Sequence, residues 1–268
     1  MRVSALTPDV RPAAVAGLFY PGRPAELGAA LDTLLAGPAT AAVAPKALIV
    51  PHAGYVYSGA VAGHAYRALR PVAGSIRRVV LVGPSHREWF RGLALPRARA
   101  FATPLGLAPV DAATVATLAT LPNVLVSDVP HAREHSLEVQ LPFLQRLMPE
   151  AQIVPIVVGE ATAEEVEAVV DALWDGPETL VVVSSDLSHY HSYGQARARD
   201  SATAGAILAA RAELTGADAC GCLAVNGLLR VARRRGLRVE LLDLRNSGDT
   251  AGDRDRVVGY GAFGFYDA

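Results

Sequence analysis

The fold of this chain is best indicated by the stretch Leu180-Val181-Val182-Val183-Ser184-Ser185-Asp186-Leu187-Ser188-His189. It begins with apolar residues that show no polar alternation, which is typical of a strand buried on both faces in a mostly parallel sheet. The residues that follow are mainly polar and end in a histidine. Because ligands bind beyond the carboxyl ends of the strands in open α/β sheets, this turn is a candidate functional site.

Two other apolar runs have the same design. Ala47-Leu48-Ile49-Val50 leads to a turn with His52, and Val79-Val80-Leu81-Val82 leads to a turn with His86. The carboxyl ends of parallel strands meet at one edge of a sheet. The imidazoles of His52, His86 and His189 can therefore converge although they are far apart in the sequence. This pattern predicts a metal site or an acid/base site.

The rest of the chain alternates between such runs and helical patterns, and it shows no internal repeat and no interdomain linker. The sequence therefore predicts an α/β fold with one three-layer domain over residues 1–268, in which helices flank a mixed, mostly parallel sheet. Residues 92–96 and 101–109 are expected to form a short antiparallel excursion. We expect helices at about 24–35, 58–69, 111–121, 136–148, 162–174, 193–210 and 217–235.

The composition excludes several classes of protein. The chain has 268 residues, of which 51% are hydrophobic and 19% charged, so it can bury a sizeable core. A net charge of -1 argues against nucleic acid or an anionic membrane as the main partner. Residues 1–8 lack the long apolar core of a signal peptide. Cys220 and Cys222 are too close to form an unstrained disulfide, so we expect a reducing, cytoplasmic location.

The histidine turns also contain residues that suit a site. Small neighbours leave room for a ligand beside His52 and His86, although a histidine in such a turn can also simply cap the next helix. Asp186 precedes His189 by three residues, and a carboxylate at this spacing can hold an imidazole in one tautomer. The alternative is a solvated polar loop, which is our interpretation of His191.

A second histidine pair lies in the sequence His131-Ala132-Arg133-Glu134-His135. Its residue pattern matches the inverted zinc-peptidase motif, in which one helix carries two histidine ligands and a catalytic glutamate. That interpretation requires a helix that is already wound at His131. We favour a helix that begins near Ser136 and is broken or kinked at Pro142, with His135 projecting from its start toward the strand ends.

Cys220 lies early in the helix expected at about 217–235. A free cysteine is commonly a small buried hydrophobe. A thiol in the first helical turn, however, ionises more readily because it feels the positive end of the helix. Cys220 is therefore also a candidate for a soft metal ligand beside two imidazoles.

Five ordered motifs together resemble the MEMO family, whose bacterial members include AmmeMemoRadiSam system protein B. The resemblance extends from about residue 16 to 266, and Gly17-Leu18-Phe19-Tyr20-Pro21-Gly22 fits it too. The motifs are Pro51-His52-Ala53-Gly54-Tyr55-Val56-Tyr57-Ser58-Gly59, Gly83-Pro84-Ser85-His86, Glu134-His135-Ser136-Leu137-Glu138-Val139-Gln140-Leu141-Pro142, Ser184-Ser185-Asp186-Leu187-Ser188-His189 and Val257-Val258-Gly259-Tyr260-Gly261.

The resemblance implies a fold similar to the class III extradiol (LigB-like) dioxygenases, which hold Fe(II) with two histidines and a glutamate. In the MEMO family a cysteine takes the place of the glutamate. Carried over to this chain, the metal ligands are His52, His86 and Cys220. The resemblance also implies that Asp186, His189 and His135 line the same pocket as acid/base or outer groups. Cys222 departs from the family pattern, since other members often have a basic residue or histidine there.

We therefore expect a cytoplasmic metal-binding protein with one mononuclear site of two histidines and one cysteine. Iron or copper is the expected metal, zinc is also possible, and the expected role is redox chemistry or metal handling. The alternatives are a non-haem Fe(II) dioxygenase-type enzyme, a peptide- or protein-binding module without turnover, and zinc hydrolysis through His131, Glu134 and His135. In each case a small-molecule or peptide ligand would occupy the cleft.

Overall fold

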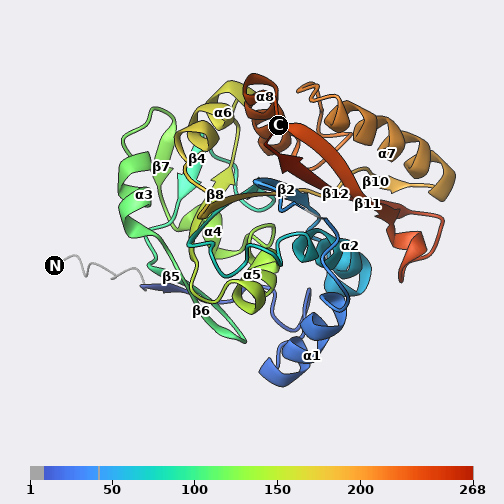
Figure 1. Cartoon of the computed structure of the whole chain (residues 1–268), viewed down its shortest axis with the longest axis horizontal. Helices are drawn as coiled ribbons and strands as arrows, with labels where there is room; N and C mark the ends of the chain where they lie inside the picture. The colour runs from blue at the N-terminus through green and yellow to red at the C-terminus, as the bar shows by residue number, and fades with distance from the viewer. Residues whose placement is uncertain (1–8, 42, 268) are drawn as a thin grey trace.

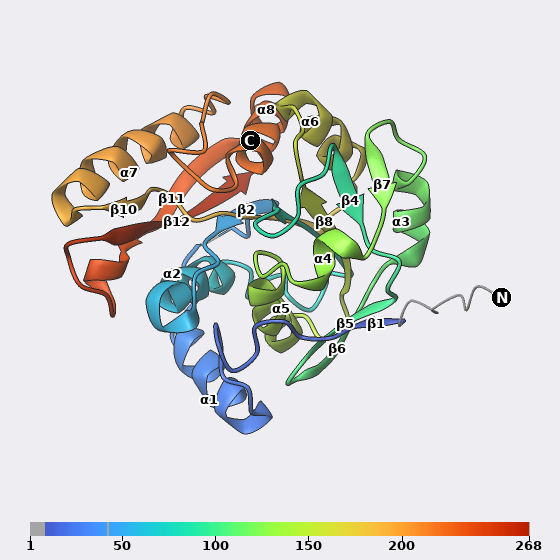
Figure 2. The ribbon, with the colours of Figure 1, turned by 180° about the vertical axis from the view of Figure 1, so that it is seen from behind.

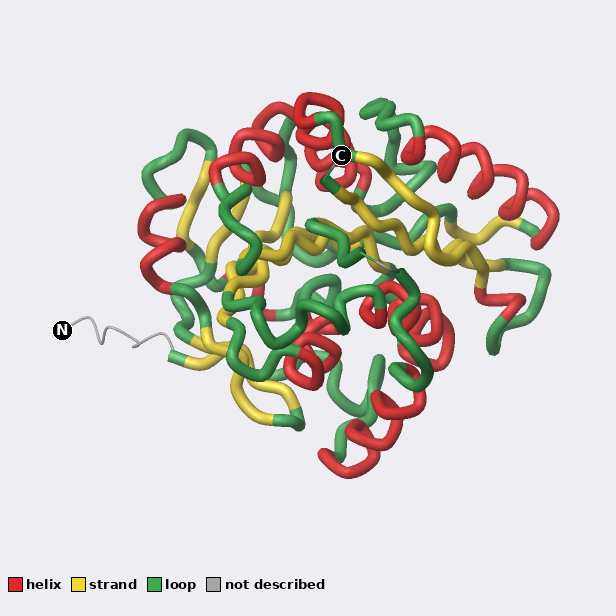
Figure 3. The backbone as a smooth tube through the Cα atoms, in the orientation of Figure 1, coloured by secondary structure: helices red, strands yellow, loops and turns green. Residues whose placement is uncertain are grey.

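A computed structural model describes residues 9–41 and 43–267 of the chain, and residues 1–8, which were predicted to lack a signal peptide, lie outside that part. A nine-stranded sheet crosses the molecule, and Figure 3 shows its strands as a yellow layer between two groups of red helices. In spatial order its strands are β10 (His189–His191), β12 (Val257–Tyr266), β2 (Ala47–Val50), β9 (Thr179–Ser184), β3 (Arg78–Pro84), β8 (Gln152–Val158), β4 (Leu93–Leu95) and β7 (Val124–Val126), with β11 (Arg238–Asn246) also paired to β12.

The centre of the sheet is parallel, as the apolar runs predict. β2 pairs with β9, β9 with β3 and β3 with β8, all in parallel. Residues Leu48, Val80 and Val182 in these strands are completely buried, which explains why the runs have no polar alternation. Val50 lies opposite Ser184, so the turns after β2 and β9 begin at the same edge of the sheet.

The outer pairings make the sheet mixed. β12 runs antiparallel to β2, β10 and β11, and β4 runs antiparallel to β8. A separate small sheet contains β1 (Val10–Arg11), β5 (Ala100–Thr103) and β6 (Gly106–Pro109). The hairpin at 100–109 was predicted, but residues 93–95 belong to the main sheet as β4 and not to the excursion.

Helices cover both faces of the main sheet, which confirms the three-layer α/β prediction. α6, α7 and α8 lie on one side, and α1, α2 and α5 lie on the other, as Figures 1 and 2 show from opposite directions. Among the described residues, no helix is both long and apolar enough to cross a membrane. The helices are α1 (Pro24–Leu34), α2 (Tyr55–Arg67), α3 (Ala112–Leu118), α4 (Val129–Ala132), α5 (Leu141–Leu147), α6 (Ala163–Ala172), α7 (Tyr193–Leu208) and α8 (Cys222–Arg235), with 3₁₀ turns η1 (Glu138–Gln140) and η2 (Ser247–Asp249).

Two α-helices, α5 and α8, start five residues later than predicted, at 141 instead of 136 and at 222 instead of 217, and both differences bear on the site. The helix expected at 136–148 is a 3₁₀ turn followed by α5, and Pro142 lies in the first turn of α5, where a proline is tolerated, so it causes no kink. The last predicted helix begins only at Cys222. Cys220 therefore precedes α8, and the prediction that its thiol lies in the first helical turn is wrong.

Candidate metal centre

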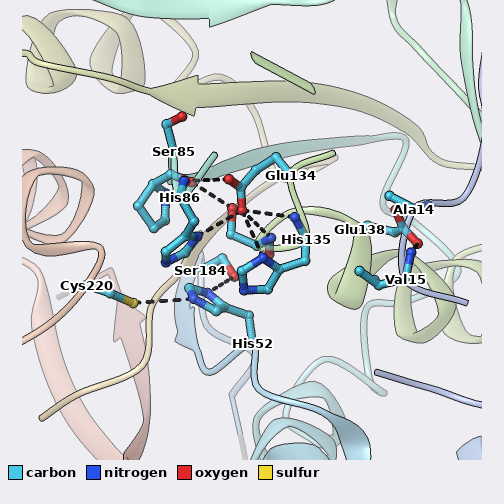
Figure 4. Close-up of polar contacts among 12 residues, drawn as sticks. Ala14, Val15, His52, Ser85, His86, Glu134, His135, Glu138, Ser184 and Cys220 are labelled. Atoms are coloured by element: carbon cyan, nitrogen blue, oxygen red, sulfur yellow. Dashed lines mark hydrogen bonds and ion pairs between the residues drawn. The ribbon is translucent and has the colours of Figure 1, made fainter. Parts of the chain in front are cut away.

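Three of the side chains predicted as ligands meet at the carboxyl edge of the sheet. One ligand atom from each of His52, His86 and Cys220 lies within 4.8 Å of the other two. Cys220 Sγ is 3.3 Å from His52 Nε2, and the imidazole centroids of His52 and His86 are 5.2 Å apart. Figure 4 shows the thiol of Cys220 directed at the His52 ring. The predicted convergence of residues 52, 86 and 220 is therefore present in the fold.

A hydrogen-bond network fixes the tautomer of His52. Its Nδ1 lies 2.9 Å from Ser184 Oγ, and this hydroxyl donates its only proton to the carbonyl of Ser136 at 2.7 Å. Ser184 Oγ also accepts an N–H from Gln140 Nε2 at 2.9 Å. Because the hydroxyl has no further proton, His52 Nδ1 must carry the hydrogen of the pair. Nε2 of His52 is thus unprotonated and directed at Cys220.

His86 is held in the same tautomer by a carboxylate. Glu134 accepts the backbone N–H of His86 at 2.6 Å and lies 2.9 Å from His86 Nδ1. Burial opposes the ionisation of Glu134, but the hydrogen bonds and charge of His86 outweigh it and lower the pKa of the carboxyl to about 2. An ionised carboxylate only accepts, so His86 Nδ1–H donates, and Nε2 is the ring nitrogen that remains available to a cation.

A tight backbone contact positions Cys220. The N–H of Gly221 donates to Ser185 Oγ at 3.0 Å, which holds the loop against the turn after β9. A Cβ on Gly221 would lie 2.8 Å from Ser185 Cβ and 2.9 Å from the Ser184 carbonyl oxygen. Only glycine allows this approach. Burial raises the pKa of the Cys220 thiol to about 12, so the prediction of a readily ionised thiol is wrong for the metal-free protein.

The three side chains fit a single metal cation. Ligands bound to one tetrahedral cation at about 2.0–2.3 Å lie roughly 3.3–3.7 Å from one another. The distance of 3.3 Å between His52 Nε2 and Cys220 Sγ is of this size. Two imidazoles and a thiol, which must lose its proton on binding, form a donor set that suits copper, zinc or Fe(II).

His135 lies beside the two ligand imidazoles. Its ring centroid is 4.6 Å from that of His86 and 5.4 Å from that of His52. Burial lowers the pKa of His135 to about 4, so the ring is neutral; its buried Nδ1 lies 3.4 Å from Glu134 Oε1 but forms no hydrogen bond. His86, Glu134 and His135 also form a group within 4.8 Å. Glu134 Oε1, however, already accepts the backbone N–H groups of His135 and Ser136, each at 2.9 Å.

Asp186 and His189 lie in the same turn. The predicted contact between them is not formed. Asp186 Oδ1 accepts the backbone N–H of His52 at 2.7 Å, because the ends of β2 and β9 are adjacent. Burial raises the pKa of Asp186 to about 7. His189 Nδ1 donates instead to the carbonyl of Leu187 at 2.8 Å. The carboxylate therefore orients the His52 turn, and a backbone carbonyl fixes the tautomer of His189.

The inverted zinc-peptidase interpretation is wrong. α4 ends at Ala132, so His131 and His135 do not share one helix. The His131 ring is buried, its Nε2 donates to the carbonyl of Ala94 at 3.1 Å, and it packs against Phe101. His131 is in neither group of potential ligands found among the described residues.

A buried ion pair that the sequence did not reveal supports the loop with Glu134 and His135. Arg11 forms an ion pair with Glu138, and both side chains are almost completely buried. The Arg11 guanidinium also donates to the backbone carbonyls of His131 at 2.8 Å and Glu134 at 2.6 Å. The chain near residue 11 therefore braces the loop that positions His86. Ser184, Gln140 and Glu138 gave no separate signal, because their roles depend on contacts with distant parts of the chain.

The chain is similar to known proteins over most of its length. A sequence model described as "Memo-like protein" matches residues 11–263. A "MEMO1 family protein" of Aquifex aeolicus is 35% identical over 266 residues, covering 94% of this chain and 97% of the relative. A second, from Archaeoglobus fulgidus, is 38% identical over 270 residues with the same two coverages, 94% and 97%. The crystal structure of the uncharacterised protein JW3007 from Escherichia coli K12 is 13% identical and superposes with a TM-score of 0.46. The match covers 81% of this chain and 98% of the JW3007 chain.

Proposed function

The chain belongs to the Memo-like protein family, and from this premise we propose that it is a cytoplasmic metal-binding protein with one mononuclear site. His52, His86 and Cys220 would hold the metal. The observation that carries the proposal is the grouping of their ligand atoms within 4.8 Å. The hydrogen bonds that each imidazole Nδ1 donates to Ser184 and Glu134 support it, because they leave Nε2 of each ring available to the metal. Two free cysteines favour a reducing compartment.

The donor set supports iron or copper, with zinc as a further possibility. A thiolate is a soft ligand, and two imidazoles beside it suit each of these metals. The bound metal would supply redox or Lewis-acid chemistry. The role we propose is therefore redox chemistry or the handling of iron or copper. A cavity of about 180 Å³ that borders Cys220 has room for a small-molecule ligand.

The neighbouring histidines favour an oxygenase-type enzyme as a second candidate. His135 is neutral, and its Nδ1 forms no hydrogen bond with the described residues. His189 uses only Nδ1 in a protein hydrogen bond. Burial lowers the pKa of His52, and the neighbouring His86, His135 and His189 lower it further. The imidazole of either His135 or His189 could accept a proton from a substrate at the centre. Oxygen consumption with a catechol that His189→Gln abolishes, without loss of metal binding, would support this candidate.

Anaerobic titration of the metal-free protein with Fe(II), Cu(I) and Zn(II) tests the metal site. We expect the wild type to bind one equivalent of at least one of them, and we expect His52→Ala and Cys220→Ser to lose stoichiometric binding. His64→Gln is a matched control, because His64 lies on α2 at 3.6 Å from Asp243 and outside the ligand group. Unchanged affinity in both ligand variants would contradict the proposal.

A further inference from the structure

A cavity approaches the proposed centre from the side of α8. It has a volume of about 180 Å³ and lies between the turn after β3, the end of β8 and the start of α8. Cys220 forms part of its wall, and so does Ser85, the residue before His86. Cys220 therefore belongs both to the cavity wall and to the ligand group, in which its Sγ lies 3.3 Å from His52 Nε2.

A second thiol lines this cavity. Cys222, the first residue of α8, is on the wall together with Cys220, and both thiols are free and partly buried. Gly221 separates them and holds the loop against Ser185. Cys220 is close to His52, whereas Cys222 belongs to neither group of potential ligands among the described residues. Two thiols on one small cavity are a favourable environment for a soft cation.

The charges on the wall are acidic. Glu88 and Glu160 line the cavity, and the described lining residues include no lysine or arginine. Glu88 is paired with Arg133 at 2.8 Å, while Glu160 is exposed and forms no ion pair with the described residues. A cleft lined by one sign of charge concentrates ions of the opposite sign and raises their association rate. Because Arg133 compensates the charge of Glu88, the attraction of this cavity for cations comes from Glu160.

We infer that Cys222 is a transfer ligand, which captures a soft metal cation in this cavity and passes it to Cys220. The inference rests on the proposed function of the centre. On capture, the Cys222 thiol releases its proton to water and forms a sulfur–metal bond. On transfer, the Cys220 thiol releases its proton and bonds the cation, the bond to Cys222 breaks, and Cys222 regains a proton from water. Each cation releases one proton in total, and nothing is oxidised or reduced.

Anaerobic stopped-flow mixing of the reduced, metal-free full chain with Co²⁺ tests the transfer role, since thiolate ligation to Co²⁺ produces near-ultraviolet absorption. We expect Cys222→Ser to lower the uptake rate constant about tenfold, the effect of one lost contact in the rate-limiting step. The final absorption and the stoichiometry should match the wild type, because Cys220 remains. Cys222→His, which keeps a metal ligand at this position, should restore most of the rate.

The acidic wall is tested in the same experiment. Glu160→Gln should slow uptake several-fold at low ionic strength and less at high ionic strength, because the attraction is electrostatic. Glu150→Gln is the matched control, since Glu150 is exposed and precedes β8, whereas Glu160 follows the other end of that strand. We expect this control to take up Co²⁺ at the wild-type rate.

The outcomes separate this inference from the proposed function. Equal uptake rates in the wild type and Cys222→Ser would overturn the transfer role and leave the metal centre intact. Loss of equilibrium binding in Cys222→Ser with retention in Cys220→Ser would also overturn it, because Cys222 would then be the permanent ligand. Absence of thiolate absorption in the wild type would overturn the proposed function and this inference together.

Discussion

The hydroxyl group of Ser184 controls which nitrogen of His52 faces the centre. It donates a hydrogen bond to the Ser136 carbonyl and accepts hydrogen bonds from His52 Nδ1 and Gln140 Nε2, so all of its hydrogen-bonding capacity is used. Glu134 has the same effect on His86. Ser184 and Glu134 therefore orient the two imidazoles for cation binding, although neither side chain would be a metal ligand.

Ser184→Ala should lower the metal affinity about 10- to 100-fold, the usual effect of losing an outer hydrogen bond to a histidine ligand. The reason is that His52 Nδ1–H loses its acceptor, so the ring is no longer fixed in one tautomer and orientation. Competition with a chelating dye measures the affinity, and circular dichroism checks the fold. Ser201→Ala, at an exposed position of α7, is the control and should bind as the wild type does. An affinity of Ser184→Ala equal to that of this control would refute the role.

His131 makes the stability depend on pH. Burial, and then the charge of Arg11, lower the pKa of His131 to about 4, whereas Asp128 and Glu134 act in the opposite direction. Between about pH 6.5 and pH 4 the unfolded chain takes up a proton here and the folded chain does not. The free energy of unfolding should therefore fall as the pH falls through this range, by up to about 3 kcal/mol from this residue.

Urea unfolding at about pH 7 and about pH 5 measures this dependence. In His131→Phe, whose ring can pack against Phe101, the loss of stability between the two pH values should be clearly smaller than in the wild type. Comparing the two slopes removes the contribution of the other buried histidines. Identical slopes would show that His131 titrates normally in the folded protein.

The loop before α8 depends on one glycine for its approach to β9. A Cβ on Gly221 would meet the side chain of Ser185 and the carbonyl of Ser184 at less than 3.0 Å. A clash with backbone atoms cannot be relieved by a small side-chain movement, so the loop would move away from the turn after β9. Because Cys220 is the neighbouring residue, its thiol would move away from His52 as well.

Gly221→Ala should therefore weaken metal binding as strongly as loss of the Cys220 thiol, although no ligand is replaced. Gly216→Ala is the matched control, since a Cβ there has nothing within 4 Å. Isothermal titration of both variants with Zn(II) or Cu(I) gives the affinities. Wild-type affinity in Gly221→Ala would mean that the loop can shift without moving the thiol.

Across the whole molecule, the proposed ligands join three distant parts of the chain. His52 follows β2, His86 follows β3 and Cys220 precedes α8, so only the folded chain brings them together. A cation that binds this group therefore binds the folded state in preference to the unfolded state.

Metal at about 100 times its dissociation constant should stabilise the folded state by about 2.7 kcal/mol. For a chain of this size that corresponds to a rise in Tm of roughly 5 °C or more. Differential scanning fluorimetry with and without the metal measures the rise, and a chelator should reverse it. Cys220→Ser should show little of the rise; an undiminished rise in this variant would place the bound metal elsewhere.

Three central strands, the α/β class and the histidine turns that follow these strands could be predicted from the amino-acid sequence alone. Apolar runs and turn residues are local signals, and they can be recognised without knowing which segments pack against them. The sequence also indicated His52, His86 and Cys220 through the family resemblance. The outer hydrogen bonds of Ser184 and Glu134 could not be predicted, because they join residues 132 and 48 positions apart.

The protonation states and hydrogen-bond partners of the histidines, of Asp186 and of Cys220 became clear only from the folded structure. It separated His131 from His135, because α4 ends between them, and it turned Asp186 toward the His52 turn and away from His189. It also made the Cys220 thiol a weaker acid than its place in the sequence suggested, because burial outweighs the position beside a helix. The physical reason is common to these cases. Hydrogen-bond partners and burial are set by packing between distant segments, which no local pattern encodes.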